Sequence, residues 1–206
     1  MKDWFRFQKF LIRTNASFLV RYWTTASAAL ERVKNDPSTY KEFQVNGADS
    51  NYVEAVVSSH HEYHCYSGVL ITYAMLDEFL TVLIKDLRQL HNVRLELSDV
   101  KARGVRRYEK YILDECSIAP SEMNVDWNFL KEFSVVRNAI IHANGNKSLL
   151  SESQKHKLEV VVKKYPGELS FKHSAKLVVE NAFIERCIGK TVESATKINS
   201  YLSTKV

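Results

Sequence analysis

The sequence predicts a mainly α-helical fold: an up-and-down helical bundle with a small β-hairpin inserted near residues 158–172. The chain has 206 residues, enough for one compact core, and 45% of them are apolar. Only six glycines and three prolines occur, fewer than a turn-rich all-β fold needs. Apolar residues recur at intervals of three and four along most long segments, as in helices that bury one face. We therefore expect one helical domain over residues 1–206.

The first expected element is an amphipathic helix over about residues 3–34, which ends before Asp36-Pro37. One face of it carries Trp4, Phe7, Leu11, Phe18 and Tyr22. We expect that face to dock on the domain or on a second subunit. Because basic residues occupy much of the remaining surface, a helix lying on a membrane surface is the alternative. A loop with a turn at Asn46-Gly47 follows.

A core over about residues 49–150 comes next, and it begins with the central helix, which Asp49 or Ser50 caps and which extends to Leu90. A break near Ser58-Ser59 is an alternative to one continuous helix. The second half has the strongest helical periodicity in the chain. Its inward residues are expected to be Val69, Leu70, Tyr73, Leu76, Phe79, Leu80, Leu83, Ile84 and Leu87. Whether Asp77 or Glu78 also turns inward stays open.

The remaining elements follow from the same patterns. A third helix is expected over Ser98–Glu115 with Ser98 as its cap, and another from about Val125 to Ala143. The β-branched run Leu158–Val162 and the alternating Leu169–Phe171 predict a two-stranded hairpin around a turn. A helix over Asn181–Leu202 is the last expected element. The hairpin and this helix together are expected to occupy about residues 158–204.

The segment Phe133–Gly145, FSVVRNAIIHANG, contains the most distinctive polar residues. The preceding apolar spacing is helical, and Asn144-Gly145 is a left-handed helix stop. Arg137, Asn138 and His142 therefore fall in the last two turns of an otherwise buried helix, with Asn138 and His142 four residues apart on one face.

This segment resembles the signature of the HEPN superfamily. The ribonucleases of that superfamily have an arginine and a histidine separated by four to six residues, often with asparagine directly after the arginine. Arg137-Asn138-Ala139-Ile140-Ile141-His142 is the form with four intervening residues. The resemblance implies a metal-independent endoribonuclease that leaves a 2′,3′-cyclic phosphate and a 5′-hydroxyl. It also implies a site shared between two signature helices, usually across a dimer.

The residue chemistry is consistent with that activity. Histidine titrates near neutral pH and suits proton transfer to or from the 2′-oxygen and the leaving 5′-oxygen. Arginine binds a phosphate bidentately, and Asn138 can position His142 or the phosphate. Because one helix offers one histidine, two proton transfers imply a homodimer. The structural alternative is that Arg137 pairs with an acidic residue and His142 caps the helix.

Two further clusters carry weaker signals. Lys101, Arg103, Arg106, Arg107 and Lys110, beside Tyr108 and Tyr111, suit an RNA backbone, although a solvated helix face is the default interpretation. The segment His60–Cys65 places His60 with His64, and His61 with Cys65, on shared helix faces that suit zinc. Since no second cluster of metal ligands occurs, we favour the interpretation that this segment is a polar helix surface or a dimer contact. A further alternative is that one of these histidines reaches the catalytic cleft between two subunits. No metal and no cofactor are predicted.

The expected function is thus a metal-independent endoribonuclease, a toxin or phage-defence factor that acts on RNA and is restrained by an antitoxin or another regulatory protein. The net charge of +5 is compatible with a polyanion partner. The three cysteines, Cys65, Cys116 and Cys187, indicate free thiols in a reducing cytoplasm. No signal peptide and no stretch apolar enough to span a bilayer are expected, hence no stable membrane insertion.

Two other classes of function remain. The first is a non-catalytic HEPN-like dimer that serves as a regulatory or interaction protein, and superfamily members of that kind generally have degraded signatures. The second is a helical protein that binds a membrane surface or a metal. No glycine-rich phosphate loop and no hydrolase nucleophile motif occur, which argues against nucleotide triphosphate chemistry and acyl transfer.

Overall fold

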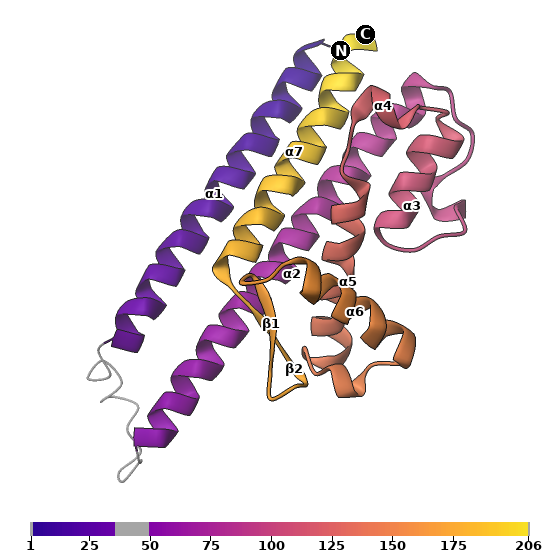
Figure 1. The fold of residues 1–206 in the computed structure, drawn as a ribbon. Helices are drawn as coiled ribbons and strands as arrows, with labels where there is room; N and C mark the ends of the chain where they lie inside the picture. The colour runs from indigo at the N-terminus through magenta and orange to yellow at the C-terminus, as the bar shows by residue number, and fades with distance from the viewer. Residues whose placement is uncertain (1, 36–49, 206) are drawn as a thin grey trace.

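Four long helices form an up-and-down bundle in the computed structural model, which describes residues 2–35 and 50–205. They are α1 (Lys2–Asn35), α2 (Ser50–Leu90), α5 (Trp127–Ala143) and α7 (Asn181–Lys205). Helix α7 packs along both α1 and α2, and α5 packs on α2 (Figure 1). The predicted stop at Asp36-Pro37, the turn at Asn46-Gly47 and the cap at Asp49 lie outside the described residues. The mainly helical fold with a small hairpin is as predicted.

Helix α2 is the central helix and is continuous through Ser58-Ser59. Its predicted inward residues are buried, except Leu70, which is partly buried. The stretch Ala55–Leu90 is long and apolar enough to cross a membrane by length and composition, so the expectation that no stretch would be is wrong. The same apolarity is explained by the position of α2 in the bundle, since 56% of the most apolar window is buried against other helices.

The face of α1 that packs on the bundle differs from the predicted one. Phe5, Ile12, Ala16 and Trp23 are buried against α2 and α7. The five residues expected to dock are all exposed: Trp4, Phe7, Leu11, Phe18 and Tyr22. Docking of this face on the domain is therefore wrong, whereas docking on a second subunit stays a prediction. The physical cause is that α1 has two apolar faces, and periodicity does not tell which one meets the neighbouring helices.

The third predicted helix is shorter than expected. Leu97–Asp99 is a 3₁₀ turn, and α3 (Val105–Lys110) begins only after Gly104, whose φ of +54° interrupts the helix. A π-helical turn, Tyr111–Glu115, continues α3. Ser98 therefore caps no α-helix. The short α4 (Pro120–Met123) leads into α5.

The predicted hairpin is displaced along the sequence. Leu158–Val162 belongs to helix α6 (Glu152–Lys164), not to a strand. The hairpin consists of β1 (Leu169–Lys172) and β2 (Lys176–Val179), antiparallel, with Leu169 opposite Val179. Helix α6 is favoured because Ser151 N–H donates to Gln154 Oε1 (3.0 Å) at its start, and because Leu158 and Val161 bury one helical face. These two effects outweigh the β-propensity of three consecutive valines.

Candidate functional site

Helix α5 has the boundaries that its sequence predicts. Asp126 caps its start by accepting a hydrogen bond from Phe129 N–H (3.1 Å). It ends at Asn144, which is left-handed with φ +46°, followed by Gly145 with φ +70°. Lys176 of β2 donates to the Asn144 carbonyl oxygen (2.6 Å). The hairpin thus holds the end of α5 that carries the polar residues.

A pocket of about 620 Å³ lies between α2, α5 and the turn that precedes α3. It is lined by Leu70, Tyr73, Ala74, Asp77, Arg103, Gly104, Ser134, Arg137, Asn138, Ile141 and His142. All three residues of the predicted catalytic set are therefore brought to one pocket. Arg103 is the member of the predicted basic cluster that joins them.

Arg137 and Asn138 contact each other in this pocket. Arg137 Nη1 donates to Asn138 Oδ1 (2.9 Å), and the guanidinium lies 5.0 Å from the centre of the Tyr73 ring. Tyr73 Oη in turn donates to Ser134 Oγ (3.3 Å). Within residues 2–35 and 50–205 Arg137 makes no ion pair, so its charge is not neutralised by a carboxylate there. An incoming anion would find this guanidinium already oriented.

His142 is exposed, whereas Arg137 and Asn138 are half-buried. Its imidazole makes no hydrogen bond within the described part of the chain, so the side chain does not cap α5. Ile141 beside it is 46% exposed. The histidine therefore lies where the pocket opens to solvent and is accessible to a ligand.

Asp77 is the acidic residue of the pocket, which answers the question that the sequence left open. Its carboxylate accepts a hydrogen bond from Tyr108 Oη (2.6 Å), which also contacts Thr81 Oγ1 (3.0 Å). Burial, and then the Asp77 carboxylate, raise the pKa of Tyr108 to about 12. Glu78 lines a different groove, between α1 and α2. Asp77 was one of two acidic candidates in the sequence, whereas Tyr73 and Ser134 were not predicted as site residues, because periodicity marks burial and does not show which pocket a side chain enters.

The rest of the basic cluster does not surround the pocket. Lys101, Arg106 and Lys110 are exposed, and Arg107 Nε donates to the Ala102 carbonyl oxygen (2.9 Å). Tyr108 and Tyr111 are buried in the core, so they do not offer the stacking surfaces that the sequence suggested. Of the predicted basic cluster, Arg103 is thus the member that lines the α2–α5 pocket.

The His60–Cys65 segment packs the bundle together. His64 stacks on Trp23 of α1 (ring centres 3.9 Å apart), and its Nε2 contacts Ser27 Oγ (3.1 Å). Burial, and then the nearby His61, lower the pKa of His64. Cys65 is buried, which raises its pKa to about 12 and makes it a poor thiolate ligand. No group of metal ligands forms among the described residues, and none of these side chains lines the α2–α5 pocket.

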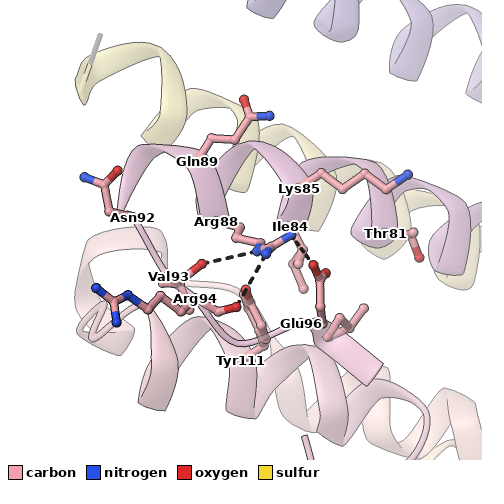
Figure 2. Close-up of a pocket in the computed structure, with 11 residues that line it drawn as sticks. Thr81, Ile84, Lys85, Arg88, Gln89, Asn92, Val93, Arg94, Glu96 and Tyr111 are labelled. Atoms are coloured by element: carbon pink, nitrogen blue, oxygen red, sulfur yellow. Dashed lines mark hydrogen bonds and ion pairs between the residues drawn. The ribbon is translucent and has the colours of Figure 1, made fainter. Parts of the chain in front are cut away.

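A second pocket, of about 720 Å³, lies at the end of α2 and contains none of the predicted site residues (Figure 2). Arg88 is at its centre and binds the loop that follows α2: it donates to the Val93 and Arg94 carbonyl oxygens and pairs with Glu96 (2.5 Å). The positive charge of Arg88 is thus neutralised by Glu96. We interpret these contacts as holding the loop against the end of α2.

Comparison of the chain with protein-family models, with curated proteins and with solved structures found no match.

Proposed function

We propose that the protein is a metal-independent endoribonuclease of the HEPN type, with Arg137, Asn138 and His142 in its active site. The observation that carries the proposal is that these three residues share one solvent-open pocket with Arg103. Two guanidinium groups in one pocket are suited to a phosphodiester, which is anionic and gains charge on its oxygens during cleavage.

In this proposal His142 takes the proton from the ribose 2′-hydroxyl. The 2′-oxygen then attacks phosphorus, and the bond to the 5′-oxygen breaks. Arg137 binds the non-bridging oxygens, where negative charge develops. The leaving 5′-oxygen needs a proton, and a second His142 from another copy of the chain supplies it. The products are a 2′,3′-cyclic phosphate and a 5′-hydroxyl.

The rim of the pocket supports a homodimer. Ile141, which lines the pocket beside His142, is 46% exposed. We infer that this exposed isoleucine is buried against another apolar surface in a dimer. A second copy docked there would place two His142 side chains in one cleft. As a cytoplasmic toxin or phage-defence factor, such an enzyme would be restrained by an antitoxin or another regulatory protein.

The test is cleavage of total RNA in the presence of EDTA by the wild-type protein and by His142→Ala. We expect a loss of at least about 100-fold, since a general acid or base contributes roughly that much. His156→Ala is the matched control, because His156 is exposed on α6 and does not line the pocket. Equal cleavage by His142→Ala and wild type would exclude the mechanism.

A wild-type protein that cleaves no RNA and does not inhibit growth on induction would favour the alternative, a non-catalytic dimeric interaction protein. That alternative has its own observation, the exposed Ile141 at the pocket. It predicts that partner binding survives when Arg137 and His142 are both replaced by alanine.

A further inference from the structure

The outward face of α1 is unusually apolar for a surface. Seven of the fourteen large exposed hydrophobic side chains in the described part of the chain belong to this one helix. They are Trp4, Phe7, Phe10, Leu11, Phe18, Val20 and Tyr22. Phe10 is 61% exposed and Phe18 is 67% exposed. Single exposed apolar residues are ordinary, but a run of them over five turns of one helix marks a contact surface.

Trp4 and Leu11 border α2, since Trp4 Nε1 donates to Asp86 and Leu11 lines the groove between α1 and α2. The other five do not form the packing face of α1. That role belongs to Phe5, Ile12, Ala16 and Trp23, which are buried against α2 and α7. Helix α1 lies at one edge of the bundle, and none of the other described helices or strands runs along its outer side (Figure 1). Since it has 34 residues, that side is about 50 Å long. A flat surface can therefore contact it along most of its length.

The charges on α1 indicate what this surface contacts. Between Trp4 and Leu30 the helix has four basic residues and no acidic one. These are Arg6, Lys9, Arg13 and Arg21. At about 100° per residue, Arg6 and Arg13 lie beside Phe10 on the flank away from α2. On the α2 side, Asp86 is occupied, because it accepts hydrogen bonds from Gln8 Nε2 (2.6 Å) and Trp4 Nε1 (3.4 Å).

We propose that α1 binds the surface of a membrane that contains anionic lipids. Its axis lies in the plane of the interface, Phe10 and Phe18 enter the region between headgroups and acyl chains, and Arg13 and Arg21 bind lipid phosphates. A second copy of the chain fits the charges less well. A two-fold contact through this face would bring Arg13 and Arg21 of one copy near the same cations of the other, whereas an anionic surface complements them.

Sedimentation with vesicles tests the proposal with the full chain. Two kinds of vesicle are used, one of phosphatidylcholine alone and one of equal parts phosphatidylcholine and phosphatidylserine. We expect at least tenfold stronger binding to the mixed vesicles, and loss of that preference in high salt. Phe10→Ser with Phe18→Ser, and separately Arg13→Glu with Arg21→Glu, should each weaken binding at least tenfold.

Matched controls use residues of the same kind elsewhere. Leu149→Ser with Val160→Ser replaces exposed apolar residues outside α1, and Lys157→Glu with Lys163→Glu reverses exposed charges on α6. Both should bind like wild type, and circular dichroism confirms that each variant is folded. Absence of binding to the mixed vesicles, or equal binding by the α1 variants, would overturn the proposal. The proposal would also be overturned if the wild-type protein bound no vesicles and the double variant Phe10→Ser with Phe18→Ser changed from dimer to monomer. That result would assign the face to a second copy of the chain.

Discussion

Gly145 determines how the end of α5, and with it His142, is held against the hairpin. Its φ is +70°, and an added Cβ would lie 1.9 Å from Tyr66 Oη. That hydroxyl donates to the Leu177 carbonyl oxygen (2.6 Å), while Leu177 N–H donates to the Gly145 carbonyl oxygen (2.8 Å). The glycine is therefore required both for its backbone conformation and for the close approach of Tyr66.

Gly145→Ala should lower the free energy of unfolding by about 2–4 kcal/mol, since it combines left-handed strain with a clash that separates Tyr66 from the hairpin. Urea denaturation measures it. Gly167→Ala is the matched control: its φ is +80°, but no atom lies within 4 Å of the added Cβ, so strain alone should cost about 1 kcal/mol. Equal losses in both variants would show that Tyr66 does not matter.

His64 should make stability depend on pH. Burial, and then His61, lower its pKa in the folded protein below the ordinary value near 6.5. As the pH falls through about 6.5, the unfolded chain takes up a proton that the folded chain does not, so the folded state loses stability. The loss ends once the pH is below the lowered pKa of the folded state.

We therefore expect the free energy of unfolding to fall between pH 7.5 and pH 5, and to fall less in His64→Gln. Denaturation curves at several pH values measure the effect. His156→Gln, at an exposed position on α6, should keep the wild-type dependence. If His64→Gln kept it as well, the dependence would belong to other groups.

The contact between α1 and α2 depends on a second glycine. An added Cβ at Gly68 would lie 2.5–3.0 Å from three atoms of the Trp23 ring, so the two helices approach closely only because this side chain is absent. Trp23 is also stacked on His64. Trp23 thus packs on the inner face of α1 together with Phe5, Ile12 and Ala16, while Phe7, Phe10, Phe18 and Tyr22 stay exposed.

Gly68→Ala should destabilise the protein by about 1–3 kcal/mol, because overpacking outweighs the better helix propensity of alanine. Thermal unfolding followed by circular dichroism measures the change. Gly189→Ala in α7 is the control, since nothing lies within 4 Å of its added Cβ, and it should stabilise by up to about 1 kcal/mol. Stabilisation by both variants would contradict the close packing of α1 on α2.

The two proposed functional surfaces lie on different sides of the bundle. Tyr73, Ala74 and Asp77 of α2 line the pocket with α5, whereas Phe79 and Leu83 line the groove shared with α1. A dimer formed at the pocket therefore leaves the outer face of α1 free. On these proposals, a dimeric nuclease would contact lipid through α1 without covering its own active site.

Dimer formation has a direct test at the pocket rim. Ile141→Glu should weaken self-association by at least tenfold, because it places a charge in the proposed apolar contact, and it should lower RNA cleavage in parallel. Sedimentation velocity gives the oligomeric state. Leu149→Glu, at another exposed apolar position, should change neither quantity. A dimer unaffected by Ile141→Glu would place the subunit interface elsewhere.

The helical class, the bounds of α5 and the burial of α2 were predictable because they depend on residues close together in the chain. Apolar spacing, the cap at Asp126 and the left-handed Asn144-Gly145 stop act within a few residues, and the structure shows each of them. The same locality explains the errors. Three successive valines predicted a strand, but the start of α6 at Ser151 and the packing of Leu158 decided for a helix.

What the sequence by itself determined is the four long helices of the bundle and the placement of Arg137, Asn138 and His142 on the last turns of one of them. Only the tertiary structure decided which groups surround that trio, because Asp77 and Arg103 reach it from segments more than thirty residues away. It also decided which of the two apolar faces of α1 is buried. Periodicity reports that a face is apolar, but burial depends on the neighbouring helix, and here the space beside Gly68 accepts Trp23 and leaves Phe10 and Phe18 exposed.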